Sequence, residues 1–403
     1  MDWHDLNLKH LRVFVEVSRA QSISAATGTA NMSQPAITQA IMGLERKLNS
    51  KLFTRRERAM FPTQTGKILE VRVNRAASFL DELSDRKRLG FDRHKLKQLS
   101  TRQLRALIAV AESRSYSEAA RFIAVSQPSL YRSAKELEER CGVTIFGKSN
   151  RGIDLTSAGG SLYRGAKLAF AEIDQAIDEI EISEGRRQGR LRIGSLPLAR
   201  GTILPNAINT FLKHHPETRI SIKDSPYEEL LDALRLGDID LTIGALRDPI
   251  PAGDVVQEYL FDDRLGVYCG PEHPMLFSAS VDKHALAEFP WVVARGDTPT
   301  RRHFEKFFAG LTPSVNGPAV ETNSMATVRH LLSDNHKLAL LSVTQAAEHV
   351  ALTQIKRLPI DVGDKPRRIG VTFRKNWRPT VKQAAFLTEL RRPTQTRNIS
   401  PYT

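Results

Sequence analysis

The stretch MSQPAITQAI at residues 32–41 recurs without gaps as VSQPSLYRSA at residues 125–134, an offset of 93 positions. The same offset aligns positions on both sides of this stretch: Leu11 with Leu104, Glu45 with Glu138, Phe53 with Phe146, and Gly66 with Gly159. An offset shared by so many positions is typical of a duplicated structural unit. We therefore expect two copies of one unit in the first half of the chain.

Each copy of Ser-Gln-Pro is predicted to begin a helix. Ser33 is a good N-cap, and Pro35 falls in the first turn, where its missing N–H is not needed. We expect the Ser33 hydroxyl to accept a hydrogen bond from the N–H of Ala36. Apolar residues then recur at helical spacing. The predicted buried positions are Ile37, Ile41, Leu44 and Leu48 in the first copy, and Leu130, Ala134, Leu137 and Cys141 in the second.

A short helix over residues 23–30, a tight turn and this second helix describe a helix-turn-helix, whose second helix presents its N-terminal residues to the major groove. A basic segment follows each helix, and we interpret it as a wing on the sugar-phosphate backbone. A capped helix with a polar start is common, but its recurrence with a wing at the same distance favours DNA binding. The candidate DNA-binding residues are Ser33, Gln34, Pro35, Thr38, Gln39, Arg55, Arg56 and Arg58 in the first copy, and Ser126, Gln127, Pro128, Tyr131, Arg132, Lys148 and Arg151 in the second.

A third helix is predicted after each wing, starting near Thr63 and near Thr156. Apolar residues in both helices follow alternating spacings of three and four, which is typical of helix–helix pairing. Packing of these helices against the chain's own globular core is the alternative. The seam residues are Leu69, Val73, Ala76, Leu80 and Leu83 in one helix, and Leu162, Ala166, Ala169, Ile173, Ala176 and Ile180 in the other.

After Gly189, short apolar strands alternate with helical patterns, which predicts an α/β domain with a largely parallel sheet. The expected fold class is multidomain, α plus α/β. The predicted domain plan is a first winged helix-turn-helix with its linker helix (1–83), a connector (84–98), a second winged unit with its linker helix (99–182), a hinge (183–189), an effector-binding domain (190–392) and a disordered tail (393–403).

Composition restricts the partners and the location. The net charge of +14 and pI of about 9.9 favour an anionic partner, nucleic acid first. No run approaches the roughly 18 apolar residues of a membrane span, and MDWHDLNLKH has no signal-peptide pattern. Cys141 and Cys269 belong to no Cys/His cluster, so we expect two buried thiols in a cytoplasmic protein with no metal and no cofactor.

Taken together, these motifs resemble the LysR-type transcriptional regulators of bacteria. The resemblance rests on the SQP-plus-LE pattern, the wing residues Leu52, Phe53 and Arg55, and Thr63 and Gly66 at the start of the linker helix. It also rests on GRLRIGSLPLARGTILP, GDIDLTIGALRDP, GDTPTRRHFEKFF and LALLS in the C-terminal half. The resemblance is greatest to the branch associated with galactose and aromatic-acid metabolism.

The resemblance implies a regulator that is not an enzyme, with a two-lobed effector domain similar to periplasmic binding proteins. Its implied partners are a double-stranded DNA operator, a small-molecule effector, RNA polymerase and further copies of the chain in a homodimer or homotetramer. The effector is expected to be a carboxylate-bearing, aromatic or sugar-derived metabolite. The residues implied to line its cleft, with simple helix capping as the alternative, are Ser195, Leu196, Ser225, Thr298, Thr300, Arg301, Thr322, Asn323 and Ser324.

The chain departs from the family in having two winged units instead of one. The first looks weaker, because Thr29 stands where the family has a Leu in its second helix and the second copy has Phe122. Which copy reads DNA therefore stays open, and one copy acting only as a dimerisation or protein-contact module is the alternative. We hypothesise that helices 66–83 and 159–181 pair within one chain, with pairing between chains as the other possibility.

Two other classes fit less well. An enzyme is disfavoured because the histidines are scattered and there is no HExxH, GxSxG or P-loop motif. A secreted solute-binding protein would account only for residues 190–390.

Overall fold

The computed structural model describes residues 3–56, 59–186, 189–296, 298–311, 320–363 and 366–392. Arg58 and the predicted tail 393–403 lie outside these residues. The chain divides into two compact units, Met1–Arg190 with Leu236–Asp238, and Leu191–Arg235 with Ile239–Thr403. Among the described residues, no helix combines the length and the apolar character needed to cross a lipid bilayer.

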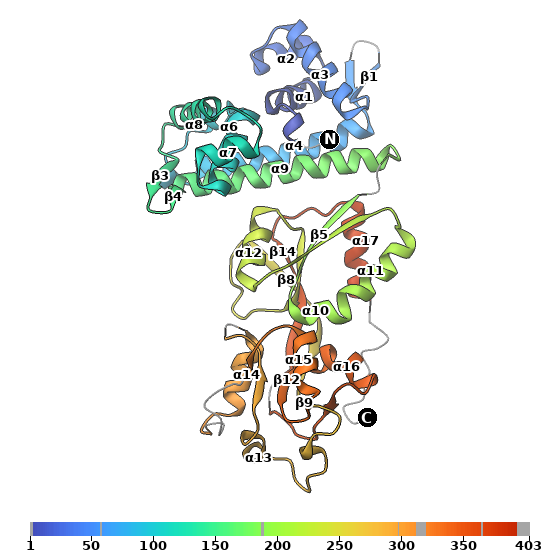
Figure 1. Cartoon of the computed structure of the whole chain (residues 1–403). Helices are drawn as coiled ribbons and strands as arrows, with labels where there is room; N and C mark the ends of the chain where they lie inside the picture. The colour runs from blue at the N-terminus through green and yellow to red at the C-terminus, as the bar shows by residue number, and fades with distance from the viewer. Residues whose placement is uncertain are drawn as a thin grey trace. The chain divides into compact units, whose positions relative to one another are not determined.

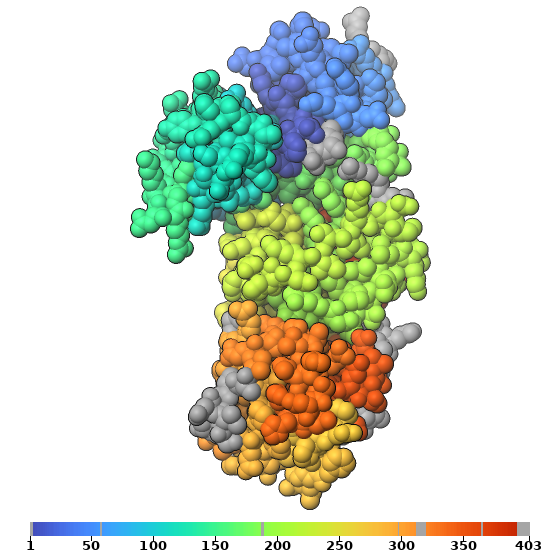
Figure 2. All heavy atoms as spheres, viewed as in Figure 1, coloured from blue at the N-terminus to red at the C-terminus, as the bar shows by residue number. Residues whose placement is uncertain are grey.

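The first unit contains the same series of elements twice (Figure 1). The first copy comprises η1 (Trp3–Asp5), α1 (Leu8–Ala20), α2 (Ile23–Ala30), α3 (Gln34–Leu48), β1 (Phe53–Arg56), β2 (Ala59–Pro62) and α4 (Gln64–Asp85). The second comprises α6 (Thr101–Ser113), α7 (Tyr116–Phe122), α8 (Gln127–Cys141), β3 (Phe146–Ser149), β4 (Gly152–Leu155) and α9 (Ser157–Ser183). In the space-filling view, blue atoms of the first copy and teal atoms of the second form separate lobes (Figure 2).

The turns of the two copies also match at the level of the backbone. Residues with positive φ recur at the offset of 93: Gln21 with Arg114, Asn31 with Ala124, and Asn49 with Gly142. Positive φ is unfavourable for most residues, so its repetition at equivalent positions means that both copies use the same turn conformations. All eight predicted apolar positions on α3 and α8 are buried, which confirms the helical spacing.

The predicted Ser cap is wrong. Ser33 and Ser126 do occupy the N-cap positions, with proline in the first turn, but neither side chain makes a capping hydrogen bond. Both serines are exposed. Water can therefore satisfy the free N–H groups of the first turn, and a side-chain cap is not required.

The position that Thr29 and Phe122 share in the two copies is not part of the core. Both residues are exposed, and Phe122 keeps 76% of its surface accessible. The buried contacts of these short helices come instead from Ala26 in α2 and Ala119 in α7. The first copy forms a complete α2, so Thr29 does not disrupt it.

The repeated Leu-Glu pair joins each recognition helix to its wing. The leucine is buried, and the glutamate carboxylate accepts from backbone N–H groups at the start of the wing. Glu45 accepts from Leu52 at 2.9 Å, and Glu138 accepts from Ile145 at 2.9 Å and from Phe146 at 3.1 Å. Each wing is thus anchored to the helix that precedes it.

A threonine followed three residues later by a glycine begins each linker helix, and local contacts explain why both residues are needed. Thr156 accepts from the N–H of Gly159 at 3.0 Å and donates to the carbonyl of Thr144 at 2.7 Å, and Thr63 makes the equivalent bonds in the first copy. A Cβ added at Gly159 would lie 2.2 Å from the carbonyl oxygen of Ile145. Glycine is required there because the helix start passes directly over the backbone that leads into the wing.

Substitution of Gly159 by alanine is therefore expected to lower the free energy of unfolding by about 1–3 kcal/mol through overpacking. Gly160, the next residue of the same helix, has no atom within 4 Å of an added Cβ. Alanine at Gly160 is expected to raise the stability by up to about 1 kcal/mol, from helix propensity alone. Urea unfolding of the two variants checks the prediction, and changes of the same sign would contradict it.

The predicted connector is not an extended linker. It contains η2 (Lys87–Leu89) and α5 (Arg93–Lys97), and three of its apolar residues, Leu89, Phe91 and Leu96, are buried in the core that contains both linker helices. Leu99, the residue directly after the connector, is buried in the same core.

The linker helices α4 and α9 pair with each other within the chain, which confirms the intrachain hypothesis. Every predicted seam residue of both helices is buried. At Gly165 an added Cβ would lie 3.0 Å from the carbonyl oxygen of Phe79, so the helix backbones approach closely at this point.

The second unit consists of two lobes, each with a five-stranded sheet covered by helices. The first sheet has the order β6-β5-β7-β14-β8, and the second β11-β10-β12-β9-β13. The first-lobe strands are β5 (Arg190–Ser195), β6 (Arg219–Asp224), β7 (Leu241–Ala245), β8 (Val255–Asp263) and β14 (Arg367–Arg374). The second-lobe strands are β9 (Leu265–Cys269), β10 (Trp291–Val293), β11 (Val320–Glu321), β12 (Leu338–Ser342) and β13 (Lys356–Arg357).

The expectation of largely parallel sheets is only partly right. Strand β5 runs parallel to β7, and β10 parallel to β11 and β12, but β14 is antiparallel to β7 and β8, and β9 is antiparallel to β12 and β13. The physical reason is the double crossing between lobes: β9 and β14 each enter their sheet from the other lobe. The long strands β8 and β14 lie side by side at this crossing (Figure 1).

The second unit has helices between its strands, as the alternating pattern after Gly189 predicts. Two of them are α11 (Ile203–His214), between β5 and β6, and α12 (Tyr227–Leu236), between β6 and β7. The others are α10 (Pro197–Gly201), α13 (Lys283–Ala287), α14 (Pro299–Phe307), α15 (Met325–Leu332), α16 (Val343–Ala351) and α17 (Val381–Arg391), with the short η3 (Pro274–Leu276).

Candidate nucleic-acid interface and ligand cavity

The first turn of α3 presents polar side chains to solvent. Ser33, Gln34, Pro35 and Gln39 are exposed. Thr38 is half-buried, and its hydroxyl donates to the carbonyl of Gln34 at 3.0 Å. The glutamine amides of this turn can donate and accept at once, which suits the adenine edge in the major groove.

The first turn of α8 presents a different set. Ser126, Pro128 and Arg132 are exposed. Gln127 is exposed too, and its side-chain oxygen accepts from the hydroxyl of Ser117 at 3.0 Å, which fixes the direction of the amide. An arginine in this turn suits the guanine edge.

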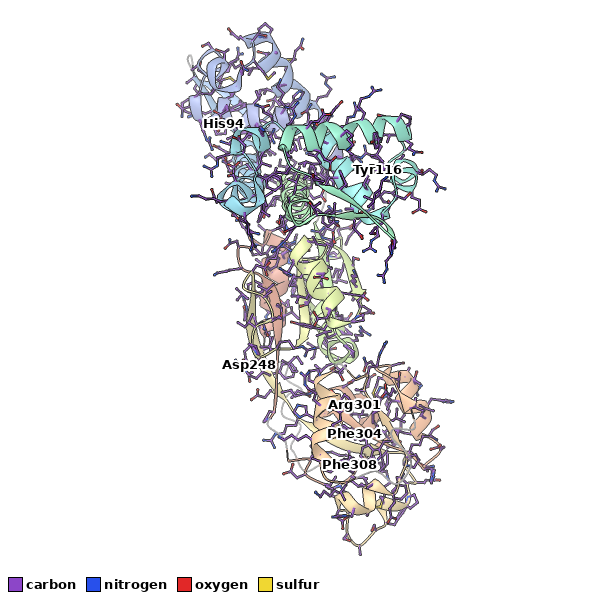
Figure 3. All side chains as sticks on the ribbon, turned by 90° about the vertical axis from the view of Figure 1, so that its left-hand side faces the viewer. His94, Tyr116, Asp248, Arg301, Phe304 and Phe308 are labelled. Carbon is purple, nitrogen blue, oxygen red and sulfur yellow. The ribbon has the colours of Figure 1, made fainter. Side chains whose placement is uncertain are left out.

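Tyr131 on α8 is supported from α7. Its ring packs edge-on against Tyr116, with centroids 5.2 Å apart, and the side chain remains 47% exposed. Figure 3 marks Tyr116 in the second copy. The phenol of Tyr131 is thus held by an aromatic contact while part of its surface stays open to a partner.

The wings carry exposed cations in both copies. Arg55 and Arg56 lie on β1, and Lys148 lies on β3, with Arg151 in the turn before β4. Backbone bonds tie each wing to the turn after the first helix of its copy: Met60 N–H donates to Gln21, and Ile153 N–H to Arg114, both at 2.9 Å. Each copy therefore combines an exposed helix start with a basic hairpin attached to the same core.

A cavity of about 700 Å³ lies between the two lobes of the second unit. Six of the nine residues predicted to line an effector cleft do line it: Leu196, Ser225, Thr298, Thr300, Thr322 and Asn323. They follow strands or precede helices in both lobes, which is where ligands bind in open α/β folds.

The other three predicted residues are engaged elsewhere. Ser195 is fully buried at the end of β5. Arg301 forms ion pairs with Glu305 at 2.9 Å and with Glu321 at 2.5 Å. Ser324 caps α15 by accepting from the N–H of Thr327 at 3.3 Å, so helix capping is its observed role.

Arg301 lies at the start of α14, followed along the same segment by Phe304 and, just beyond the helix, Phe308 (Figure 3). The rings of Phe304 and Phe308 pack on Trp291.

Sequence reasoning missed the charged residues of the cavity. Among its described lining residues are four arginines and two carboxylates, so the lining favours an anionic ligand. Arg200 pairs with Asp224 at 2.9 Å, and the guanidinium of Arg247 lies 4.1 Å from the centre of the Tyr227 ring. The sequence offered one signal, the position of Arg247 just beyond the strand DLTIG. The four arginines are Arg200, Arg247, Arg295 and Arg367.

Arg367 opens β14 and contacts both lobes. Its guanidinium pairs with Asp263, the last residue of β8, and donates to the hydroxyl of Thr300 on α14 at 2.6 Å. Asp263 also accepts from Ser342 at 2.7 Å and from the N–H of Thr344 at 3.2 Å. This group joins the two crossing strands to elements of the second lobe at the wall of the cavity.

The two cysteines are buried free thiols, as predicted. Burial raises the pKa of Cys141 to about 11 and that of Cys269 to about 12. Within the described residues, no group of three or more His, Cys, Asp or Glu side chains could hold a metal ion. Because their pKa values are raised, both thiols stay protonated at neutral pH and are poor nucleophiles.

Alkylation by iodoacetamide at pH 8 tests this assignment. With a pKa of about 11, only about a thousandth of Cys141 is thiolate at this pH, against about a quarter of an unfolded cysteine. We expect labelling of the native protein to be at least about a hundredfold slower than labelling in guanidinium chloride. Rapid labelling of either thiol in the native protein would contradict its burial.

Comparison with protein families gives two matches. The model described as "LysR substrate binding domain" matches residues 184–394. The model described as "Bacterial regulatory helix-turn-helix protein, lysR family" matches twice, at residues 8–67 and 101–160. The two segments matched by the helix-turn-helix model fall on the two copies described above.

Individual proteins similar to this chain are also helix-turn-helix transcriptional regulators. The HTH-type transcriptional regulator GalR of Pseudomonas putida is 31% identical over 369 residues, which cover 91% of this chain and 92% of that protein. The regulator PcaQ of Agrobacterium fabrum is 27% identical over 295 residues, 73% of this chain and 94% of that protein.

Two solved structures resemble the fold. Full-length OxyR from Pseudomonas aeruginosa has a TM-score of 0.54 at 22% identity, covering 73% of this chain and 98% of that one. CbnR in complex with its target DNA has a TM-score of 0.50 at 21% identity, covering 72% of this chain and 98% of that one.

Proposed function

This chain belongs to the LysR family of bacterial transcriptional regulators, and we propose that it binds an operator in double-stranded DNA through both helix-turn-helix copies. The observation that carries the proposal is the exposed first turn of α3 and of α8, each followed by a basic wing at the same distance in the chain. The helix starts would read base edges, and the wings would contact phosphates.

Residues 190–392, which contain both lobes of the second unit, would act as the effector domain, with the lobes used as in periplasmic binding proteins. Four arginines on the cavity wall support an anionic ligand, and a carboxylate-bearing metabolite of aromatic or sugar origin fits a cavity of about 700 Å³. Closure of the lobes would bias the arrangement of the DNA-binding copies, and hence contacts with RNA polymerase. Since an operator lies on the chromosome, the protein would act in the cytoplasm.

A thermal-shift panel of small carboxylates, including benzoate and gluconate, tests the ligand class. A ligand at a hundred times its Kd stabilises the folded state by about 2.7 kcal/mol, enough to raise the Tm measurably. An unchanged Tm with every carboxylate at millimolar concentration would contradict an anionic effector of this kind.

Alanine substitution at the two helix starts tests the DNA-binding proposal. The variants Gln34→Ala with Gln39→Ala, and Gln127→Ala with Arg132→Ala, are each compared with the native chain on DNA flanking its own gene. We expect each pair to weaken binding about tenfold or more, because one good side chain–base pairing contributes about 1–3 kcal/mol. Footprinting and a salt titration give the affinity and the length of DNA covered.

Arg140→Ala is the matched control, since it removes the same charge from the same helix about 12 Å further along. It should leave the affinity within about twofold of the native value if Arg132 acts through a base contact. If neither pair of substitutions weakens binding, recognition through these helices is contradicted.

A second candidate is a regulator in which the first copy serves only as a contact module. The observation that favours it is that the first two turns of α3 expose no cation, whereas the second turn of α8 exposes Arg132. An unchanged affinity for the Gln34 and Gln39 variant, together with a loss for the other pair, would support this candidate.

A further inference from the structure

The interface between α4 and α9 contains a buried charge network. Arg72 is fully buried and donates to Glu172 at 2.8 Å, to Gln175 at 2.6 Å and, through two nitrogens, to Glu179 at 2.9 Å. Arg75 donates to Glu172 at 2.9 and 3.0 Å. Both cations belong to α4, and Glu172, Gln175 and Glu179 belong to α9.

The two helices pair in antiparallel fashion. Arg72 contacts Glu179, Arg75 contacts Glu172, and Leu83 lies near Gly165, so residue numbers fall along α9 as they rise along α4. An antiparallel pair of equivalent helices has an approximate twofold axis. Within one chain, this arrangement reproduces the relation that two identical subunits have in a symmetric dimer.

The network cannot form when either helix pairs with a second copy of itself. At the offset of 93, the α9 residues equivalent to Arg72 and Arg75 are Gly165 and Leu168, so two α9 helices would bury their glutamates without a cation. The residues equivalent to Glu172 and Glu179 in the first copy are Phe79 on α4 and Arg86 directly after it, so two α4 helices lose both carboxylates and gain a like charge. A buried charge without its partner is strongly unfavourable, so the network selects the mixed pair.

Further contacts hold the two copies, and with them α4 and α9, together within this chain. The buried connector joins α4 to α6 through α5, so the two copies are not linked by an extended tether. The ring of Trp3 in the first copy stacks on Phe170 of α9 at 3.6 Å. Thr101 accepts from the N–H of Leu8 and donates to the carbonyl of Leu6, both at 3.0 Å.

We infer that one chain is a complete two-headed reader whose operator consists of two different half-sites in a defined order. The inference rests on the proposed function, because it requires that both copies read DNA. In a symmetric dimer two identical helices read an inverted repeat. Here α3 offers Gln34 and Gln39, while α8 offers Tyr131 and Arg132, so one half-site is expected to present adenine edges and the other a guanine edge.

Selection from random DNA tests the inference with the full-length chain. The probe is a duplex library with about 40 random base pairs, long enough for two half-sites one or two helical turns apart. The selected site is then compared with two symmetric derivatives, each made by replacing one half with an inverted copy of the other at the same spacing. Native mass spectrometry of the complex counts the chains on each duplex.

We expect an asymmetric motif bound by one chain, with either symmetric derivative at least about tenfold weaker, since each mismatched base pair costs about 1–3 kcal/mol. Gln39→Ala should weaken contacts to one half only, and Arg132→Ala to the other; both side chains are exposed, and an unchanged Tm verifies that the variants fold. An inverted-repeat motif bound by two chains, with both substitutions affecting both halves, would overturn the inference and leave DNA binding intact. A selection that enriches no sequence would overturn the proposed function and the inference with it.

Discussion

Replacement of Arg72 by alanine is expected to lower the free energy of unfolding of the first unit by about 3–5 kcal/mol, because removal of one partner leaves buried charges uncompensated. The Arg72 side chain is 1% exposed, and that of Glu172 6%. Hydrogen bonds and charges of Glu179 and Glu172 raise the pKa of Arg72 against the effect of burial, so the guanidinium stays charged. Without it, Glu172 and Glu179 face an apolar seam with far less compensation.

The measurement is urea unfolding followed by tryptophan fluorescence. Trp3 stacks on Phe170 of α9, so its emission reports on the first unit. Trp291 and Trp377 are the other two tryptophans of the chain, and both belong to the second unit. A background in which these two are phenylalanine isolates the transition of interest.

Arg75→Ala is the matched control. The Arg75 side chain is 26% exposed, and its removal leaves Glu172 bonded to Arg72 at 2.8 Å. We expect a loss of about 1 kcal/mol, since a partly solvated pair contributes little. An equal decrease in the free energy of unfolding for Arg72→Ala and Arg75→Ala would contradict the prediction that the effect depends on how deeply the arginine is buried.

The second large effect is expected at the crossing between the lobes of the second unit. Arg367→Ala should lower the free energy of unfolding of this unit by about 3–5 kcal/mol. The side chain of Asp263 is 0% exposed, and its remaining donors in the structure, Ser342 and Thr344, are neutral groups. The substitution also removes the hydrogen bond to Thr300, which lines the cavity, so binding of the anionic ligand proposed above should weaken together with stability.

Arg391→Ala provides the comparison in the same unit. Arg391 binds the carboxylate of Glu258 on β8 through two nitrogens, at 2.6 and 2.8 Å, but the side chains are 49% and 29% exposed. Water can replace these bonds, so a loss of at most about 1 kcal/mol is expected. Unfolding followed by Trp291 and Trp377 fluorescence measures both variants, and a loss below about 1 kcal/mol for Arg367→Ala would contradict its role.

The repeat made much of the first unit predictable. Helix α2 spans Ile23–Ala30 as predicted, the apolar positions of α3 and α8 are buried, and so are the seam residues of α4 and α9. These features depend on residues three or four positions apart, which a helix places on one face whatever the surroundings. The residues of the ligand cavity were harder to predict from the sequence, since three of the nine predicted residues do not line the cavity.

The duplicated units, their helix starts, their wings and the apolar seam can be predicted from the sequence, because local spacing and the repeat at an offset of 93 encode them. The partners of the polar groups depend on the tertiary fold. Arg72 bonds to residues more than 100 positions away, and Arg367 bonds to Thr300 and Asp263 at separations of 67 and 104. The spacing of residues in the sequence does not reveal which distant residue a charged side chain contacts. The three-dimensional structure is therefore needed to show that Arg72 joins the two copies and that Arg367 joins the two lobes.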